Sequence, residues 1–291
     1  MKLMVTGGSG FLGGYVLREA ARRGHRTLAL ARSEGAAAAV TALGALPVGG
    51  DLNDAHSLLD AFAAERCDVL VNLASLGFGH APAIIAAAER AGIPRAVFVS
   101  TTAVTTTLAA TSKRVRLAAE HAVGAAAFDW TILRPTMIYG DPGDRNLSRL
   151  LPLLRRAPVL PIPGGRHLQQ PVHAADVADA VLAAAERPGA AGHTYDVAGP
   201  EPLTFAELMR TSARAVASRT RFVPVPLSPV VAAARGYELV SRNPRIRVEQ
   251  VRRLAEDKAF AIDHAVHDLG YAPRSFADGI HAEARAMGLA A

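Results

Sequence analysis

Lys113 and the hydroxyl side chains before it form the part of the sequence best suited to proton chemistry. The segment 100–123 reads STTAVTTTLAATSKRVRLAAEHAV, and Lys113 is one of only three lysines among 32 basic residues. An ammonium group can release a proton when it is desolvated or lies near other positive charge, whereas a guanidinium cannot. Lys113 is therefore a candidate for moving a proton. The hydroxyls could bind a substrate oxygen, although strand preference and helix starts also favour threonine.

A second chemical signal is the glycine-rich turn in MVTGGSGFLGGYV, residues 4–16. A strand pattern ends at Thr6, and Gly7, Gly10 and Gly13 follow at G-x-x-G-x-x-G spacing before a helix. The first glycine permits a tight turn, the second lets the backbone approach a pyrophosphate, and the third brings the helix close to the strand. The helix start also presents N–H groups and partial positive charge to phosphates. The turn therefore predicts a dinucleotide-binding loop.

The end of the second predicted strand bears on the choice of nucleotide. An NAD-preferring site has an acidic residue there for the ribose hydroxyls, whereas this strand ends in Ala31, Arg32 and Ser33. An arginine at this place suits a 2′-phosphate and favours NADP. Glu34 follows at once and keeps NAD open as an alternative, and a strand-end arginine is also common as plain solvated surface.

Strand and helix patterns alternate through the first half of the chain. Runs such as DVLVNLA and RAVFVS are continuously apolar, as in strands buried on both faces. Short links between such strands and Ala-rich helices predict an α/β fold, a Rossmann-type doubly wound parallel sheet. We expect this core to comprise residues 1–140 and 172–198. Residues 141–171 and 199–291, which are punctuated by proline, would form a small C-terminal substrate-binding subdomain over the carboxyl ends of the strands.

Composition excludes several classes of function. The chain has 291 residues, half of them hydrophobic, and a net charge of +6, but its basic residues are scattered, so we expect no nucleic-acid partner. An anionic small-molecule substrate explains the charge more simply. No apolar run is long enough to span a bilayer, and no leader is evident, so we expect no membrane partner and a cytoplasmic location. Cys67 is the sole cysteine and the histidines lack metal-ligand spacing, so no metal site is expected.

The order of motifs along nearly the whole chain resembles the extended and atypical short-chain dehydrogenase/reductase superfamily, including its epimerase/dehydratase-like branch. The motifs that carry the resemblance are TGGSGFLG, GDLND, VNLAS, VFVSTTAV, SKRVRLAAE, WTILRPTMIYG, QQPVHAADVADAV and TYDVAGPEPLTFAEL. The resemblance implies a Rossmann fold, a nicotinamide cofactor, a small-molecule substrate and, as an expectation of the class, a homodimer. In this family the segment around His173 and Asp176 mainly fixes the subdomain.

The resemblance also implies a set of site residues. The glycine loop would hold the pyrophosphate, Arg32 and Ser33 the 2′-phosphate, and the GDL motif the adenine. The implied cofactor-binding residues are Gly7, Gly10, Phe11, Leu12, Gly13, Arg32, Ser33, Asp51, Leu52, Leu73, Ala74, Ser100, Lys113, Pro135, Thr136 and Met137. Thr102 falls where such enzymes keep a catalytic serine or threonine, and Lys113 on the lysine of Tyr-x-x-x-Lys. The implied role of this lysine is to bind the nicotinamide ribose, with or without proton transfer.

The sequence departs from the family pattern at two places. No Tyr-x-x-x-Lys occurs, because Ala109 stands where the tyrosine would be. Gln169 stands where sugar-modifying members often carry an arginine for the nucleotide diphosphate. Tyr139 is a candidate replacement acid, although such a tyrosine more often only packs. These departures bring the chain nearer to atypical, tyrosine-less members.

We therefore predict an NADP(H)-dependent oxidoreductase of the atypical short-chain class. Its substrate would be a small organic carbonyl, alcohol or activated alkene, and its catalytic candidates are Lys113, Thr102 and Tyr139. Two alternatives stay open. One is an NAD(P)-dependent sugar-nucleotide epimerase or dehydratase, and the other is a non-catalytic NAD(P)-binding sensor or assembly protein.

Overall fold

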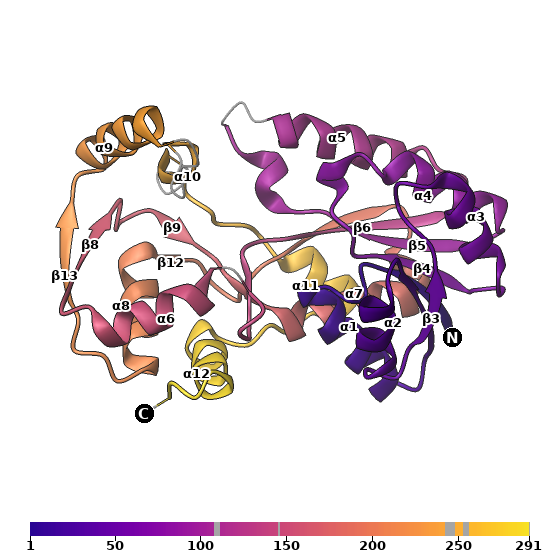
Figure 1. Ribbon diagram of the computed structural model, residues 1–291, viewed down its shortest axis with the longest axis horizontal. Coiled ribbons are helices and arrows are strands. Elements are labelled where there is room, and N and C mark those ends of the chain that lie inside the picture. Colours follow the sequence, from indigo (N-terminus) through magenta and orange to yellow (C-terminus); the bar gives the residue numbers. More distant parts are fainter. Residues whose placement is uncertain (108–110, 145, 242–247, 253–255, 291) are drawn as a thin grey trace. The chain divides into compact units, whose positions relative to one another are not determined.

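The described chain forms two compact units, each built from several stretches of sequence (Figure 1). The computed structural model describes residues 1–107, 111–144, 146–241, 248–252 and 256–290. Unit 1 comprises residues 1–136, 174–197 and 261–272. Unit 2 comprises residues 137–173, 198–260 and 273–291. The residue that replaces the family tyrosine, Ala109, lies outside the described residues.

Unit 1 is built on a seven-stranded sheet with the order β11-β6-β5-β4-β1-β2-β3. All its pairings are parallel, which confirms the predicted α/β doubly wound sheet. The chain order reverses between β1 and β4, and open sheets bind ligands at such switch points, outside the carboxyl ends of the strands. The strands are β1 (Lys2–Thr6), β2 (Arg26–Ala31), β3 (Leu46–Gly49), β4 (Val69–Asn72), β5 (Arg95–Val99), β6 (Asp129–Pro135) and β11 (His193–Val197).

Helices cover both faces of this sheet. Figure 1 shows α3, α4 and α5 on one face and α1, α2 and α7 on the other. The helices are α1 (Phe11–Arg22), α2 (Glu34–Thr41), α3 (Ala55–Ala63), α4 (Ala81–Arg90), α5 (Thr111–Gly124), α7 (Ala174–Glu186) and α11 (Asp263–Leu269). Short 3₁₀ helices are η1 (Leu76–Phe78), η2 (Thr102–Thr105) and η3 (Pro188–Ala190). Gly24, Gly44 and Gly92 have positive φ just after helix ends, where glycine is the residue that adopts this conformation most easily.

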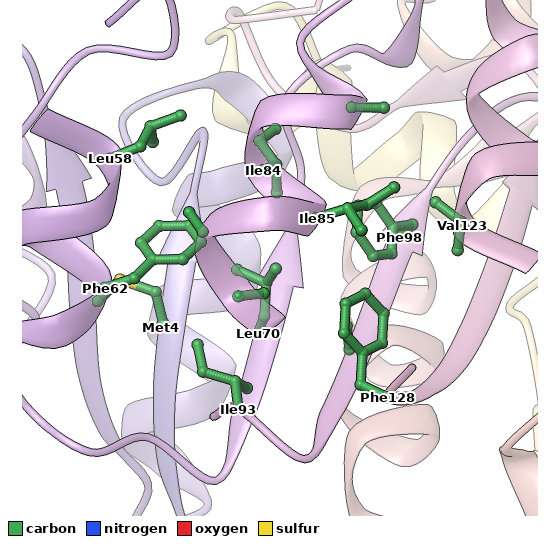
Figure 2. Packing of buried hydrophobic residues seen from close by; sticks show 14 of the residues in the cluster. Met4, Leu58, Phe62, Leu70, Ile84, Ile85, Ile93, Phe98, Val123 and Phe128 are labelled. Atoms are coloured by element: carbon green, nitrogen blue, oxygen red, sulfur yellow. The ribbon is translucent and has the colours of Figure 1, made fainter. Parts of the chain in front are cut away.

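The core beneath α3, α4 and α5 holds the sheet to that helical layer. Figure 2 shows Phe62 of α3 and Ile84 of α4 near Leu70 of β4, and Val123 of α5 beside Phe98 of β5. Each of these side chains is at most 1% exposed. Burial of apolar side chains is the main favourable contribution to folding, so this layer fixes the strands whose ends carry the candidate site.

Unit 2 contains three two-stranded sheets and several helices. The parallel pairs are β7 (Ile138–Tyr139) with β10 (Val172–His173), and β8 (Val159–Pro163) with β13 (Arg221–Val225). The antiparallel pair is β9 (Leu168–Gln169) with β12 (Leu203–Thr204). The helices are α6 (Leu147–Arg156), α8 (Phe205–Ala215), α9 (Leu227–Val240), α10 (Val248–Arg252) and α12 (Phe276–Ala286). Helix α8 begins with a capping box between Thr204 and Glu207.

The two units differ in detail from the division expected from the sequence. Residues 261–272, which include α11, belong to unit 1, whereas the sequence grouped all of 199–291 in the subdomain. The helix-like pattern at 247–259 predicts one helix, but residues 256–262 are not helical; residues 247 and 253–255 lie outside the described part of the chain. Within 256–262, the N–H of Lys258 donates to the carbonyl oxygen of Leu168 at 2.9 Å, so the chain there runs beside β9.

Candidate functional site

The glycine turn after β1 is shaped by two close backbone approaches. Gly7 has φ +73°, and a Cβ atom on it would lie 2.9 Å from the backbone nitrogen of Ala74. A Cβ atom on Gly13, in the first turn of α1, would overlap the carbonyl oxygens of Gly7 and Gly8. Gly10 precedes α1 without a side-chain cap, and the first turn of α1 has no acidic residue. The turn is therefore an uncapped helix start, with backbone N–H groups and positive dipole available to an anion.

A hydrogen-bond network ties this turn to the end of β4. The Thr6 hydroxyl donates to Oδ1 of Asn72 at 2.5 Å, and Nδ2 of Asn72 donates to the carbonyl oxygen of Ala74 at 3.0 Å. The N–H of Leu73 donates to the carbonyl oxygen of Thr6 at 3.0 Å. Thr6 and Asn72 are both fully buried. These two residues are not among the cofactor-binding residues expected from the sequence, although they lie in the motifs TGGSGFLG and VNLAS.

Arg32, the residue after β2, has an exposed side chain. It forms no ion pair or hydrogen bond with a described residue. The hydroxyl of Ser33 caps α2 by accepting a hydrogen bond from the N–H of Ala36 at 3.3 Å. Asp51 follows β3, and its carboxylate accepts hydrogen bonds from the backbone and side chain of Asn53, both at 2.9 Å. These bonds lower the pKa of Asp51, with a smaller contribution from the charge of Arg32.

The catalytic candidates Thr102 and Lys113 lie in the segment between β5 and α5. Thr102 is 7% exposed, and its hydroxyl donates to the carbonyl oxygen of Pro135 in a long contact of 3.4 Å. Lys113 lies half-buried in the first turn of α5, and its ammonium donates to the carbonyl oxygen of Thr106 at 2.5 Å. The Ser100 hydroxyl is buried and has no hydrogen-bond partner among the described residues, while its N–H donates to the Leu133 carbonyl at 2.7 Å.

A buried ion pair holds the helix that carries Lys113 against β6. The guanidinium of Arg134 donates to both carboxylate oxygens of Glu120 on α5, at 3.1 and 2.6 Å. Glu120 is 7% exposed. Arg134 is also paired in register with Asp196 on β11, whose pKa is raised by burial. No sequence pattern predicts this contact, because Glu120 lies two turns beyond Lys113 in an ordinary helical pattern.

Unit 1 thus contains most of the residues expected at the site. Four of the expected segments lie at the carboxyl ends of adjacent parallel strands. They are the glycine turn after β1, Leu73–Ala74 after β4, the segment after β5, and Pro135–Thr136 at the end of β6. Thr136 is buried, and its N–H donates to the Val197 carbonyl at 3.1 Å. Arg32, Ser33, Asp51 and Leu52 follow β2 and β3 at the same edge of the sheet.

Met137 and Tyr139 lie in unit 2, and Tyr139 is 1% exposed. Its ring makes edge-on contacts with His173 and Phe276, each with a centroid separation of 5.4 Å. Burial lowers the pKa of His173 to about 4, so this imidazole is neutral at physiological pH. This packing favours the structural interpretation of Tyr139 that the sequence left open, and of His173 as well.

The described residues of unit 1 could hold an anionic dinucleotide along this edge. The helix start of α1 suits a pyrophosphate, Arg32 suits a further phosphate, and Lys113 offers an ammonium donor. No group of three or more His, Cys, Asp or Glu side chains suited to a metal ion occurs in the part of the chain that the structure describes. None of the described helices is both long enough and apolar enough to cross a membrane.

Comparison with known proteins agrees with this geometry. Residues 7–188, more than half of the chain, match the family model described as NAD(P)H-binding. A Stigmatella aurantiaca enzyme, 4-hydroxy-2-methyl-3-oxo-4-farnesyl-3,4-dihydroquinoline-1-oxide ketoreductase, is 30% identical over 314 positions, covering 94% of this chain and 92% of that protein. The mitochondrial NADH dehydrogenase [ubiquinone] 1 alpha subcomplex subunit 9 of Arabidopsis thaliana is 30% identical over 287 positions, covering 91% of this chain and 70% of that protein.

Solved structures share the fold at lower sequence identity. UDP-glucose 4-epimerase from Thermotoga maritima, solved with UDP-glucose, superposes with a TM-score of 0.76 at 15% identity and covers 99% of each chain. The chain belongs to the NAD(P)H-binding family, and it shares its fold with the epimerase, in agreement with the resemblance that its motifs predicted. The family match and the ketoreductase relative both agree with the NAD(P)-dependent oxidoreductase that the sequence predicts.

Proposed function

We propose that the protein is an NADPH-dependent reductase of a ketone that carries an apolar chain. The choice of NADPH is supported by Arg32, whose exposed guanidinium follows β2 without an ion-pair partner among the described residues. The N–H groups at the start of α1 suit the pyrophosphate. The ketone is suggested by the Stigmatella relative, whose name contains a 3-oxo group and a farnesyl group.

The observation that carries the proposed chemistry is the hydrogen bond between the Lys113 ammonium and the Thr106 carbonyl. This bond holds the ammonium at the hydroxyl-rich segment after β5, where Thr102 is also buried. A nicotinamide cofactor supplies a hydride when it is bound. The chain must then provide one proton to the ketone oxygen, which becomes the alcohol hydroxyl. Lys113 would donate that proton, and the Thr102 hydroxyl, held only by a 3.4 Å contact, would turn to orient the oxygen.

Replacement of Lys113 tests this assignment. Lys113→Arg keeps the positive charge and hydrogen-bond donors but cannot release a proton at neutral pH. If Lys113 donates the proton, we expect kcat for ketone reduction to fall roughly 100- to 10,000-fold in this variant, with little change in the Kd for NADPH. Lys2→Arg is the matched control, because Lys2 lies at the opposite end of β1 and pairs with Glu65.

A different set of kcat and Kd values would show that Lys113 does not transfer the proton. If the lysine only binds the nicotinamide ribose, Lys113→Arg keeps its kcat while Lys113→Ala weakens NADPH binding. Steady-state turnover with a panel of apolar-chain ketones, together with NADPH titration by calorimetry, separates the two roles.

A second candidate function is that of a nucleotide-binding subunit without turnover. Two observations favour it: Ala109 in place of the family tyrosine, and the similarity to a subunit of mitochondrial NADH dehydrogenase. Tight NADPH binding without consumption on any ketone, alcohol or alkene of a broad panel would support this candidate. The epimerase alternative is less favoured, because the likeness to the epimerase is one of fold.

Three further parts of the proposal come from the sequence. Unit 2 would bind the substrate, the protein would form a homodimer, and it would reside in the cytoplasm. A reducing compartment suits Cys67, which is 2% exposed and whose pKa is raised to about 11, mainly by burial. Size-exclusion chromatography with light scattering tests the homodimer directly.

A further inference from the structure

Unit 2 contains a cavity of about 700 Å³ with largely apolar walls. It is lined by Ile162 of β8, Ala206 of α8, Phe222 and Val225 of β13, and Leu227 at the start of α9. Small-molecule sites typically measure roughly 300–1,000 Å³ and combine apolar walls with a few polar groups. The size and lining of this cavity are therefore those of a ligand site.

The walls of the cavity are fixed by backbone hydrogen bonds. Strands β8 and β13 pair in parallel, with Ile162 opposite Pro224. The turn at Gly164–Gly165 is tied to α8, because the N–H of Ala206 donates to the Gly165 carbonyl at 3.0 Å. A Cβ atom on Gly165 would lie only 3.0 Å from Cγ2 of Ile162. The cavity is thus bounded by paired strands and a closely packed turn.

Two arginines lie at the edge of this apolar space. Arg166 and Arg210 both line the cavity, and both side chains are exposed. Neither forms an ion pair with a described residue. The acidic group nearest in sequence to Arg210 is Glu207, whose carboxylate already accepts hydrogen bonds from the N–H and hydroxyl of Thr204 at 2.8 and 2.7 Å. Arg166 and Arg210 therefore offer positive charge to a ligand.

The remaining titratable group of the lining is His167. Its Nδ1 lies 3.2 Å from Oδ1 of Asp257, and that same oxygen accepts a hydrogen bond from the N–H of Leu168 at 2.9 Å. The Asp257 carboxylate therefore already has hydrogen-bond partners in His167 and Leu168. Neither arginine forms a hydrogen bond or an ion pair with a described residue, although the charge of Arg210 contributes to the lowered pKa of Glu207.

We propose that this cavity binds an amphiphile with an unbranched apolar chain and a carboxylate head, as in a medium- or long-chain fatty acid. The chain would occupy the space between Phe222, Val225 and Leu227, where its methylenes leave water. The carboxylate would remain at the edge, paired with Arg166 and Arg210. The site lies wholly within unit 2 and does not depend on the proposed nucleotide chemistry.

Calorimetric titration of the full-length protein with octanoate, decanoate and dodecanoate, below their micelle concentrations, tests the apolar part. Each additional buried methylene is expected to tighten binding by roughly three- to fourfold. Affinity that does not change with chain length would overturn the proposal. Dodecanol tests the head group, because it has the same chain without charge. Equal affinity for dodecanol and dodecanoate would also overturn it.

Variants locate the site. Leu227→Glu places a carboxylate in the apolar wall at a half-buried position, and Ala206→Trp fills the cavity; each is expected to weaken dodecanoate binding at least tenfold. The double change Arg166→Glu and Arg210→Glu should weaken it by about tenfold or more. The matched control is Arg155→Glu with Arg219→Glu, which makes the same charge change at another surface of unit 2.

NADPH titration of every variant reports on unit 1 and keeps the two proposals separate. Retained NADPH binding with lost dodecanoate binding in the cavity variants, but not in the control, is the expected result. Undiminished dodecanoate binding in folded Leu227→Glu would overturn the site even if the reductase proposal held. Near-ultraviolet circular dichroism identifies any variant that has failed to fold, and the other cavity variants then decide.

Discussion

At the scale of single residues, Arg32 is the residue expected to favour NADPH over NADH. Its guanidinium is exposed after β2, and its charge contributes to the lowered pKa of Asp51. Arg32→Glu reverses the charge at this place. We expect the Kd for NADPH to rise about 10- to 100-fold while NADH binding changes little or improves, since a charged hydrogen bond to phosphate is worth about 1.5–3 kcal/mol.

Fluorescence titration with both nucleotides measures this change of preference. Arg90→Glu is the matched control, because Arg90 is an exposed arginine of unit 1 at the end of α4. An equal loss for NADPH and NADH in Arg32→Glu would contradict a role in binding the 2′-phosphate.

Some residues of the candidate site can be identified from their neighbours in the sequence, and others cannot. Gly7 and Gly13 could be assigned from spacing alone, because the positive φ of Gly7 and the close approach of Gly13 to the carbonyl oxygens of Gly7 and Gly8 arise within the βα unit itself. Thr6 and Asn72 could not, because their hydrogen bond joins positions 66 residues apart. Tyr139 was ambiguous for the same reason: the rings that pack around it, His173 and Phe276, come from distant segments.

At the scale of elements, buried parallel strands were the most predictable part of the fold. Strand β1 ends at Thr6 as predicted, and β5 matches the apolar run RAVFVS to within one residue, because a continuously apolar run between turn residues has few other interpretations. Helix α9 was missed because its start contains Pro226 and Pro229. Proline is tolerated in the first turn, where its missing N–H has no helical partner. The opposite error was to expect a helix at 247–259. The residue types there favour a helix, but they do not show that Lys258 forms a hydrogen bond with Leu168.

The ion pair between α5 and β6 yields a prediction about these elements. Removing Glu120 leaves Arg134 beside Asp196, which can replace the lost carboxylate. Removing Arg134 leaves two largely buried carboxyl groups, Glu120 and Asp196, without their cation. We therefore expect Arg134→Met to reduce the free energy of unfolding by about 1 kcal/mol or more beyond the reduction caused by Glu120→Gln. Urea denaturation of both variants and of the double variant measures the difference.

Arg26 serves as the comparison for this ion pair. It pairs with Glu65 but is 55% exposed, so Arg26→Met is expected to change stability by less than about 1 kcal/mol. If Glu120→Gln proved as costly as Arg134→Met, Asp196 would not be acting as the second partner. Because α5 also carries Lys113, the NADPH Kd of Glu120→Gln shows whether the helix remains in place.

At the scale of the whole molecule, the chain passes repeatedly between its two units. Unit 1 takes three separate segments and so does unit 2, so neither is a continuous stretch of sequence. The sequence predicts all of 199–291 in the second unit, whereas residues 261–272 belong to unit 1. Their place in unit 1 depends on contacts such as the hydrogen bond from the Tyr195 hydroxyl to Asp268 at 3.0 Å, which no local pattern reveals.

Glu283 on α12 makes the stability of the folded chain depend on pH. Its side chain is fully buried, and neither carboxyl oxygen has a hydrogen-bond partner with good geometry among the described residues. Burial, and secondly the neighbouring Asp144 carboxyl, raises the pKa of Glu283 to about 9 from 4.5. Since the folded chain keeps this proton longer than the unfolded chain does, the associated stability is complete below pH 4.5 and is lost as pH rises to about 9.

Glu283→Gln imitates the protonated acid at every pH. We expect its Tm to equal that of the wild type near pH 4.5–5 and to exceed it by about 3–8 °C at pH 8–9, because the amide has no proton to lose. Thermal unfolding across this range measures the divergence, with Glu201→Gln, an exposed change in unit 2, as the control. A constant Tm difference at all pH values would mean that the amide only alters packing. A difference that grows with pH would establish Glu283 as a neutral acid in the folded protein.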